Sequence, residues 1–130
     1  MKHYDVVAAV ICHGDKILCM QKGRTKFTYT SYKFEFPGGK IEKGETPQQA
    51  LKRELMEEMD YDITVGDRLV KVEHEYPDFS ISLDAYMCTA ATDKFHMNEH
   101  ISNRWCTKEE LKSLDWAAAD VGIVEALCKR

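Results

Sequence analysis

Apolar and polar residues follow two periodicities along this chain, one typical of strands and one of helices. Strands are predicted where apolar residues run continuously or alternate with polar ones, over residues 6–12, 16–21, 34–36, 63–65, 69–75, 80–87 and 103–106. Between them, Gly66-Asp67 predicts a turn, and Tyr76-Pro77-Asp78 predicts the turn of a hairpin. The pattern therefore indicates a sheet interrupted by helical segments.

Helical spacing is clearest after residue 46. Thr46 suits the N-cap, Pro47 the first turn, and Gln49 the reciprocal bond of a capping box. The apolar positions of this helix recur at helical spacing: Ala50, Leu51, Leu55 and Met59. A second capping box at 107–110 predicts a short helix. A last helix is predicted over 121–128, with these residues facing inward: Val121, Val124 and Leu127.

Length and composition fit one globular domain spanning residues 1–130, with 44% hydrophobic and 31% charged residues. A net charge of −4 argues against a nucleic-acid polymer as partner. Five cysteines without a CxxC pair favour a reducing compartment, and the apolar run at 6–12 is too short to span a membrane. We expect a cytoplasmic protein without a membrane partner, either a monomer or a homodimer.

Three carboxylates lie on one face of the first helix, because Glu54, Glu57 and Glu58 occupy positions i, i+3 and i+4. Like charges at this spacing cost a few tenths of a kcal/mol per pair. Oxygen ligands on a rigid element suit a hard cation, so Mg²⁺ is expected, with Mn²⁺ as a substitute. The alternative is a solvated acidic face. The preceding loop Phe36–Lys40, the helix cap and the fixed spacing favour the metal site, and Arg53 is placed to hold Glu57.

The stretch from Gly39 to Tyr61 resembles the signature of the Nudix family. Glycine, five residues, Glu45 and seven residues precede the run from Arg53 to Tyr61, and every charged position of the signature is present. Asp60 stands where the signature has glycine, and Tyr61 stands at an apolar position. The glycine serves a backbone conformation at the helix end that Asp also tolerates, so we expect a small cost in stability and no effect on chemistry.

Similarity to MutT-type Nudix enzymes extends over nearly the whole chain, including residues 36–42, 45–47, 75–78 and the spacing from Glu99 to Trp105. The resemblance implies an α/β (α+β) fold in which a mixed β-sheet lies between helices and the signature forms a loop-helix-loop. It also implies a set of cation ligands: the Gly38 carbonyl, Glu54, Glu57, Glu58 and Glu99. Glu54 would in addition orient or deprotonate the attacking water.

Substrate-binding candidates come from other segments: Lys22, Glu35, Lys40 and Asp120. Lys22 either faces the phosphates, as the basic residue at this place does in MutT-type enzymes, or is a strand-end lysine in water. Asp120 lies where enzymes of this type that remove oxidised guanine nucleotides carry an Asn contacting the base. An ionised Asp only accepts hydrogen bonds, whereas Asn also donates. The alternative role for Asp120 is to cap the last helix.

The resemblance implies a Mg²⁺-dependent nucleoside triphosphate pyrophosphohydrolase that converts NTP and water to NMP and pyrophosphate. Its expected substrates are oxidised or non-standard nucleotides such as 8-oxo-dGTP. Alternatives are a CTP or dCTP pyrophosphohydrolase, an enzyme for another nucleoside diphosphate derivative, and a non-catalytic nucleotide-binding domain. No serine, cysteine or histidine constellation for covalent catalysis is evident, which favours direct attack by water.

Overall fold

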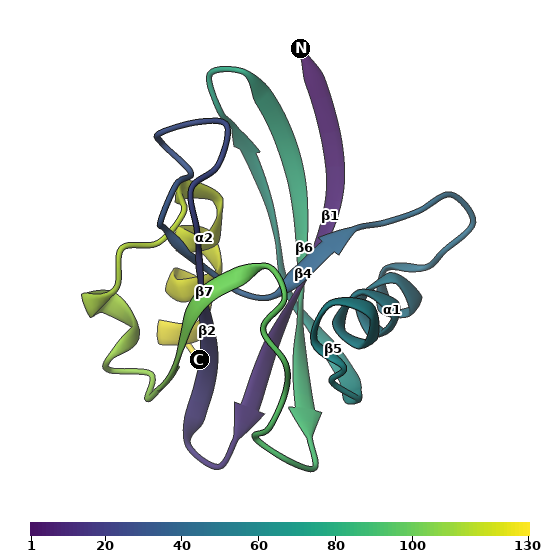
Figure 1. Cartoon of the computed structure of the whole chain (residues 1–130), viewed down its shortest axis with the longest axis vertical. Coiled ribbons are helices and arrows are strands. Elements are labelled where there is room, and N and C mark those ends of the chain that lie inside the picture. The colour runs from purple at the N-terminus through teal and green to yellow at the C-terminus, as the bar shows by residue number, and fades with distance from the viewer.

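A seven-stranded mixed sheet runs through the computed structural model, which describes residues 1–130 (Figure 1). Its strands are β1 (Lys2–His13), β2 (Lys16–Lys22), β3 (Phe34–Glu35), β4 (Gly38–Lys40), β5 (Ile63–Glu75), β6 (Phe79–Ala90) and β7 (His100–Cys106). The strand order is β3-β2-β1-β6-β5, while β4 pairs with β1 and β7 with β2. Only the pairing of β1 with β6 is parallel. The predicted mixed sheet is therefore confirmed.

Helices α1 (Pro47–Met59) and α2 (Ala118–Cys128) cover opposite faces of this sheet (Figure 1), and a short 3₁₀ turn, Leu111–Ser113, precedes α2. Each face has its own apolar core. Alternate residues of β1 point to opposite faces, so Val7 and Ala9 pack with α1, whereas Ala8 and Val10 pack with α2. Burial on both faces explains why this strand reads as a continuous apolar run. Neither helix has the length and apolar content needed to cross a membrane.

The local signals of α1 are confirmed at both ends. Thr46 Oγ1 accepts from the Gln49 amide at 3.1 Å, and Gln49 Oε1 accepts from the Thr46 amide at 2.9 Å. At the C-terminal end Asp60 takes the left-handed conformation, with φ 48° and ψ 42°. Tyr61 is buried, and its hydroxyl donates to the Thr92 carbonyl at 2.6 Å. Both departures from the Nudix signature therefore fit the positions they occupy.

Two predicted connections are wrong because they are parts of strands. Gly66-Asp67 does not turn the chain. It lies inside β5, where the register with β6 shifts between Val65 and Arg68. The glycine segment before α1 is strand β4 rather than a loop, and Gly38 pairs with Ala8 of β1. A Cβ atom at Gly38 would meet the Val7 backbone, so glycine allows the two strands to approach.

The predictions for the last quarter of the chain are only partly right. The capping box at 107–110 forms one of its two bonds, from the Thr107 amide to Glu110 Oε1 at 2.8 Å, and leads into the 3₁₀ turn rather than an α-helix. Helix α2 begins at Ala118, three residues earlier than predicted, so Asp120 lies in its first turn. Val121 is 40% exposed, and its predicted inward position is wrong. The inward face includes Asp120, a polar residue that hydropathy does not place in a core.

Candidate active site

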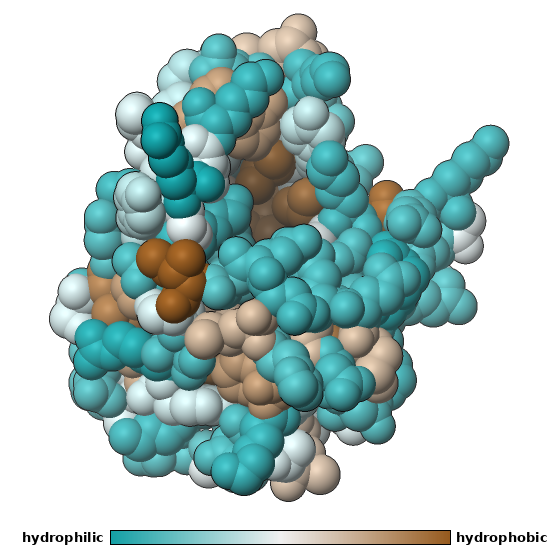
Figure 2. Space-filling view, in the orientation of Figure 1, coloured by the Kyte–Doolittle hydropathy of each residue, from teal (hydrophilic) through white to brown (hydrophobic).

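A cavity of about 1270 Å³ lies beside the sheet and receives residues from both halves of the chain. In Figure 2 it appears as a recess with an apolar floor and a hydrophilic rim. Its lining includes eight of the residues that the sequence indicated: Lys22, Glu35, Gly38, Lys40, Glu54, Glu58, Glu99 and Asp120. The fold therefore brings together groups that are up to 98 positions apart in the sequence, from 22 to 120.

Arg53 organises the acidic side of the cavity. Its Nε and Nη2 donate to the two oxygens of Glu45 at 2.6 and 2.9 Å, a bidentate pair. Its Nη1 donates to Glu54 at 3.1 Å and to Glu57 at 3.2 Å, which confirms the predicted contact with Glu57. Arg53 lowers the pKa of Glu45 to about 2, with help from the Glu42 amide. The fixed spacing of Glu45 and Arg53 thus forms one clamp around the start of the helix.

Glu54 lies against strand β4. A Cβ atom at Gly39 would meet its carboxyl group, so glycine at this position lets the strand pass close to that carboxyl. The Glu54 side chain is mostly buried and keeps its bond to Arg53. This carboxylate is consequently fixed from two sides, by β4 and by the arginine.

Glu58 lies among other acidic groups. Partial burial raises its pKa to about 8, with further increases from Glu54, Glu99 and Glu35. No three His, Cys, Asp or Glu side chains lie at the spacing that holds a metal ion without rearrangement. The donor chemistry nevertheless fits a hard divalent cation, because the groups are all oxygen ligands and no basic side chain pairs with Glu58 among its acidic neighbours. Side chains, among them Glu57 in its pair with Arg53, would have to rearrange to complete such a site.

Glu57 is the one predicted site residue that does not line the cavity. Its side chain is 61% exposed and turns toward Arg53. The i, i+3, i+4 spacing correctly places it on the same side of α1 as Glu54 and Glu58, but the arginine holds it at the rim.

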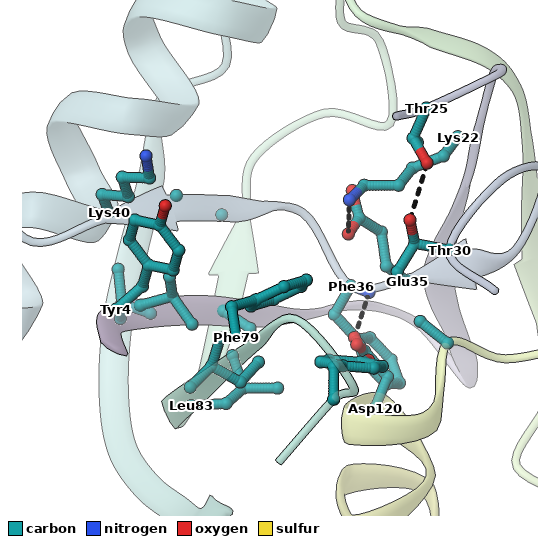
Figure 3. Close-up of a pocket in the computed structure, with 18 of the residues that line it drawn as sticks. Tyr4, Lys22, Thr25, Thr30, Glu35, Phe36, Lys40, Phe79, Leu83 and Asp120 are labelled. Atoms are coloured by element: carbon teal, nitrogen blue, oxygen red, sulfur yellow. Dashed lines mark hydrogen bonds and ion pairs between the residues drawn. The ribbon is translucent and has the colours of Figure 1, made fainter. Parts of the chain in front are cut away.

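The opposite end of the cavity is apolar and contains one buried carboxyl group. Asp120 is 6% exposed, and its Oδ2 accepts from the Phe36 amide at 3.0 Å (Figure 3). Burial raises the pKa of Asp120 to about 8, and the charge of Glu35 adds to this. The interpretation of Asp120 as a helix cap is wrong, because Ala117 occupies that position. Phe36 itself stacks on Trp116, with ring centroids 4.6 Å apart.

Glu35 connects the two ends. Its Oε1 lies 3.6 Å from Lys22 Nζ, and its Oε2 lies 2.8 Å from His100 Nε2. His100 is not among the site residues that the sequence indicates. No local signal could identify it, because its partner is 65 positions away.

Aromatic rings form the remaining wall and were also missed. Lys40 Nζ lies 4.4 Å from the centre of the Tyr4 ring, and Phe79 lies between Tyr4 and the Asp120 end in Figure 3. Phe79 packs against Tyr4 and Phe27 at centroid distances of 5.9 and 5.7 Å. Planar apolar surfaces next to a buried polar group suit a ligand with a flat heterocycle.

The chain matches the NUDIX domain over residues 2–127, and it therefore belongs to the Nudix family. It is 36% identical to the CTP pyrophosphohydrolase of Escherichia coli K12 over 97% of this chain and 92% of the relative. It is 39% identical to the 8-oxo-dGTP diphosphatase of Proteus vulgaris, over 68% of this chain and 78% of the relative. The solution structure of a MutT protein from methicillin-resistant Staphylococcus aureus 252 matches with a TM-score of 0.78 and 41% identity. The match covers 99% of this chain and 98% of that structure.

Membership of this family identifies the chain as a hydrolase of phosphorus-containing anhydrides, of the MutT type. Nudix hydrolases act on small nucleotide substrates and use a divalent metal ion. The acidic end of the cavity is the region of this chain whose chemistry fits that ion, and the apolar end is the region that fits a nucleobase.

Proposed function

We propose that this protein is a Mg²⁺-dependent nucleoside triphosphate pyrophosphohydrolase, with residues 1–130 acting as a single catalytic domain. Its reaction converts NTP and water to NMP and pyrophosphate, and its main substrates are oxidised or non-standard nucleotides such as 8-oxo-dGTP. One observation carries the proposal. A single cavity joins a cluster of carboxylates at one end to an aromatic wall with a buried carboxyl group at the other.

The acidic end would hold the cation through the Gly38 carbonyl and the carboxylates of Glu54, Glu57, Glu58 and Glu99. Bound there, a divalent cation neutralises the polyphosphate and supplies activation of water. Glu54, fixed by Arg53 and β4, orients the attacking water and accepts its proton. Lys22 and Lys40 line the same cavity and place positive charge beside the phosphates. Mn²⁺, which also takes oxygen ligands, is expected to substitute for Mg²⁺.

The apolar end would select the base. With a pKa near 8, Asp120 carries a proton over much of the neutral range, so its carboxyl group both donates and accepts hydrogen bonds. An ionised Asp would only accept, which was the premise of the sequence-based interpretation. A protonated Asp120 offers the donor and acceptor pair that an Asn offers, which supports recognition of an oxidised purine.

A second candidate is hydrolysis of CTP or dCTP. The relative from Escherichia coli named CTP pyrophosphohydrolase is similar over nearly the whole of both chains. In this case Asp120 would be ionised when the base is bound, and its oxygen that does not bind the Phe36 amide would accept from the amino group of cytosine.

Pyrophosphate release from a panel of nucleotides tests the proposal. The panel contains 8-oxo-dGTP, dGTP, CTP and dCTP, with a nucleotide sugar and a dinucleoside polyphosphate for comparison, each with Mg²⁺ and with a chelator. We expect the highest kcat/KM for 8-oxo-dGTP and no release after chelation. A preference for CTP would favour the second candidate. Binding of nucleotides without turnover of any of them would instead indicate a non-catalytic domain.

A further inference from the structure

The loop between β6 and β7 is tied to the C-terminal end of α1 by three hydrogen bonds. The Tyr61 hydroxyl donates to the Thr92 carbonyl at 2.6 Å, and the His96 amide donates to the Met59 carbonyl at 2.9 Å. The third bond runs from Asn98 Nδ2 to the carbonyl of Glu58 at 2.8 Å. Asn98 directly precedes Glu99, so this third bond fixes the chain next to Glu99 to the backbone of Glu58.

The residue after Glu99 is anchored on the other side. His100 Nε2 lies 2.8 Å from Glu35 Oε2, and its side chain is only 7% exposed. His100 also pairs through its backbone with Lys22, at the point where the register between β2 and β7 shifts. One histidine therefore contacts the strand that carries Lys22 and the carboxylate that lies beside it.

Glu99 itself is exposed and makes no hydrogen bond or ion pair through its side chain. Its position is consequently set by its two neighbours in the sequence. Ordering an exposed loop residue costs conformational entropy when a ligand binds, and fixed neighbours reduce that cost in advance. Groups that orient a metal ligand affect metal affinity for the same reason.

We propose that Asn98 and His100 are positioning residues that hold Glu99 opposite Glu58, an inference that rests on the proposed function. Asn98 acts on the acidic end alone, because its partner is the backbone of Glu58. His100 acts on both ends, because Glu35 also contacts Lys22 and its charge reaches Glu58 and Asp120. The two variants should therefore have different kinetic consequences.

Calorimetric titration of the nucleotide-free protein with Mg²⁺, together with kcat and KM for the best nucleotide at saturating Mg²⁺, separates these roles. Asn98→Ala should weaken Mg²⁺ binding about tenfold, the lower end of the range for residues that orient metal ligands, with KM for the nucleotide unchanged. His100→Leu should weaken Mg²⁺ binding and also raise that KM about tenfold. His100→Gln, which keeps an N–H donor at a similar distance from the backbone, should restore much of the Mg²⁺ affinity and bring KM back toward its native value.

Asn103→Ala is the matched control. Asn103 Nδ2 contacts Met97 Sδ at 3.2 Å, so this variant removes an amide contact to the same loop without touching Glu35 or Glu58. It should leave Mg²⁺ affinity and KM unchanged. Thermal unfolding of each variant identifies any loss of folding. If His100→Leu fails to fold, His100→Gln and Asn98→Ala still decide the outcome.

Glu99→Gln separates failure of this inference from failure of the proposed function. If Glu99→Gln weakens Mg²⁺ binding while Asn98→Ala and the His100 variants bind it normally, the positioning role is wrong and the cation site stands. Equal losses in Asn98→Ala and Asn103→Ala would also overturn the positioning role. If Glu99→Gln itself binds Mg²⁺ normally, Glu99 is not a ligand and the inference fails, whereas the proposed function fails only if Glu58→Gln also binds Mg²⁺ normally and keeps its activity.

Discussion

The two ends of the cavity each contain a carboxyl group whose pKa is raised to about 8, yet their surroundings differ. Glu58 is partly buried and has Glu54, Glu99 and Glu35 as acidic neighbours. Asp120 is buried among apolar groups, and Lys22 and the Phe36 amide partly offset the effect of Glu35. Burial is the largest cause in both cases, but repulsion from several carboxylates acts only at Glu58.

This difference indicates two ways of relieving an unfavourable charge. Where several carboxylates repel one another, a divalent cation relieves all of them at once. Where a single carboxyl group lies in an apolar pocket, a proton is sufficient, and the neutral group can then donate a hydrogen bond. A similar pKa shift therefore supports cation binding at one end and base recognition at the other.

The largest expected effect comes from Glu58→Gln. Removing a charged cation ligand should lower kcat by several orders of magnitude for every nucleotide, with the fold retained. Steady-state kinetics at saturating Mg²⁺ and circular dichroism measure the two effects. Glu109→Gln, an exposed glutamate outside the cavity, is the control.

Glu57→Gln tests whether the exposed Glu57 belongs to the same ligand group. The proposal predicts a loss comparable to that of Glu58→Gln, which requires the side chain to leave Arg53 and turn inward. A near-normal rate would remove Glu57 from the cation site and leave it as a partner of Arg53 alone.

Asp120→Asn should change selectivity rather than overall rate. We expect the ratio of kcat/KM between 8-oxo-dGTP and CTP to shift by about tenfold or more, the scale of one base-edge hydrogen bond. The ratio should also depend on pH in the native protein, since Asp120 loses its proton near pH 8, and become independent of pH in the variant. If the ratio of kcat/KM is unchanged in the variant, Asp120 does not contact the base.

The free energy of unfolding should also depend on the protonation of Asp120. The folded pKa of Asp120 is raised above its value in the unfolded chain, so the folded state holds the proton more tightly. Its contribution is present at low pH and is lost as pH rises from about 4 through about 8. Melting temperatures across this range should fall more steeply for the native protein than for Asp120→Asn.

The contribution of Glu45 to stability should change with pH in the opposite direction. Its folded pKa is lowered from 4.5 to about 2 by Arg53, so its contribution is present above the unfolded pKa. As pH falls from 4.5 to about 2, that contribution is lost. The melting temperature of Glu45→Gln should therefore depend less on pH in this acidic window than that of the native protein. Parallel curves would contradict the clamp.

Mg²⁺ should raise the melting temperature, because it binds only the folded acidic end. At 100 times its dissociation constant the gain is about 2.7 kcal/mol, enough for several degrees. Glu99→Gln should reduce the shift, whereas Asp120→Asn should leave it unchanged. A shift that is equal in all three proteins would remove the distinction between the ends.

The sequence predicted the features whose signals are local. The cap of α1, its buried face and the replacement of glycine by Asp60 depend on residues within a few positions of one another. The bulge in β5 and the pairing of β4 with β1 depend on a distant strand, so the local pattern at Gly66 and Gly38 predicts a turn and a loop instead.

Among the site residues, the family signature located the carboxylates but did not reveal their partners. Asp120 is bonded to the Phe36 amide 84 positions away, and His100 contacts Glu35, 65 positions away. Contacts over such separations are created by the tertiary fold, and no short pattern in the chain encodes them.

The most direct test of the division between the two ends measures pyrophosphate release from 8-oxo-dGTP and CTP as Mg²⁺ is varied, in the native protein, Glu58→Gln and Asp120→Asn. The account predicts that Glu58→Gln loses activity toward both nucleotides alike. It predicts that Asp120→Asn keeps the Mg²⁺ dependence and changes the ratio between the nucleotides. A change of that ratio in Glu58→Gln, or an equal loss for both nucleotides in Asp120→Asn, would contradict it.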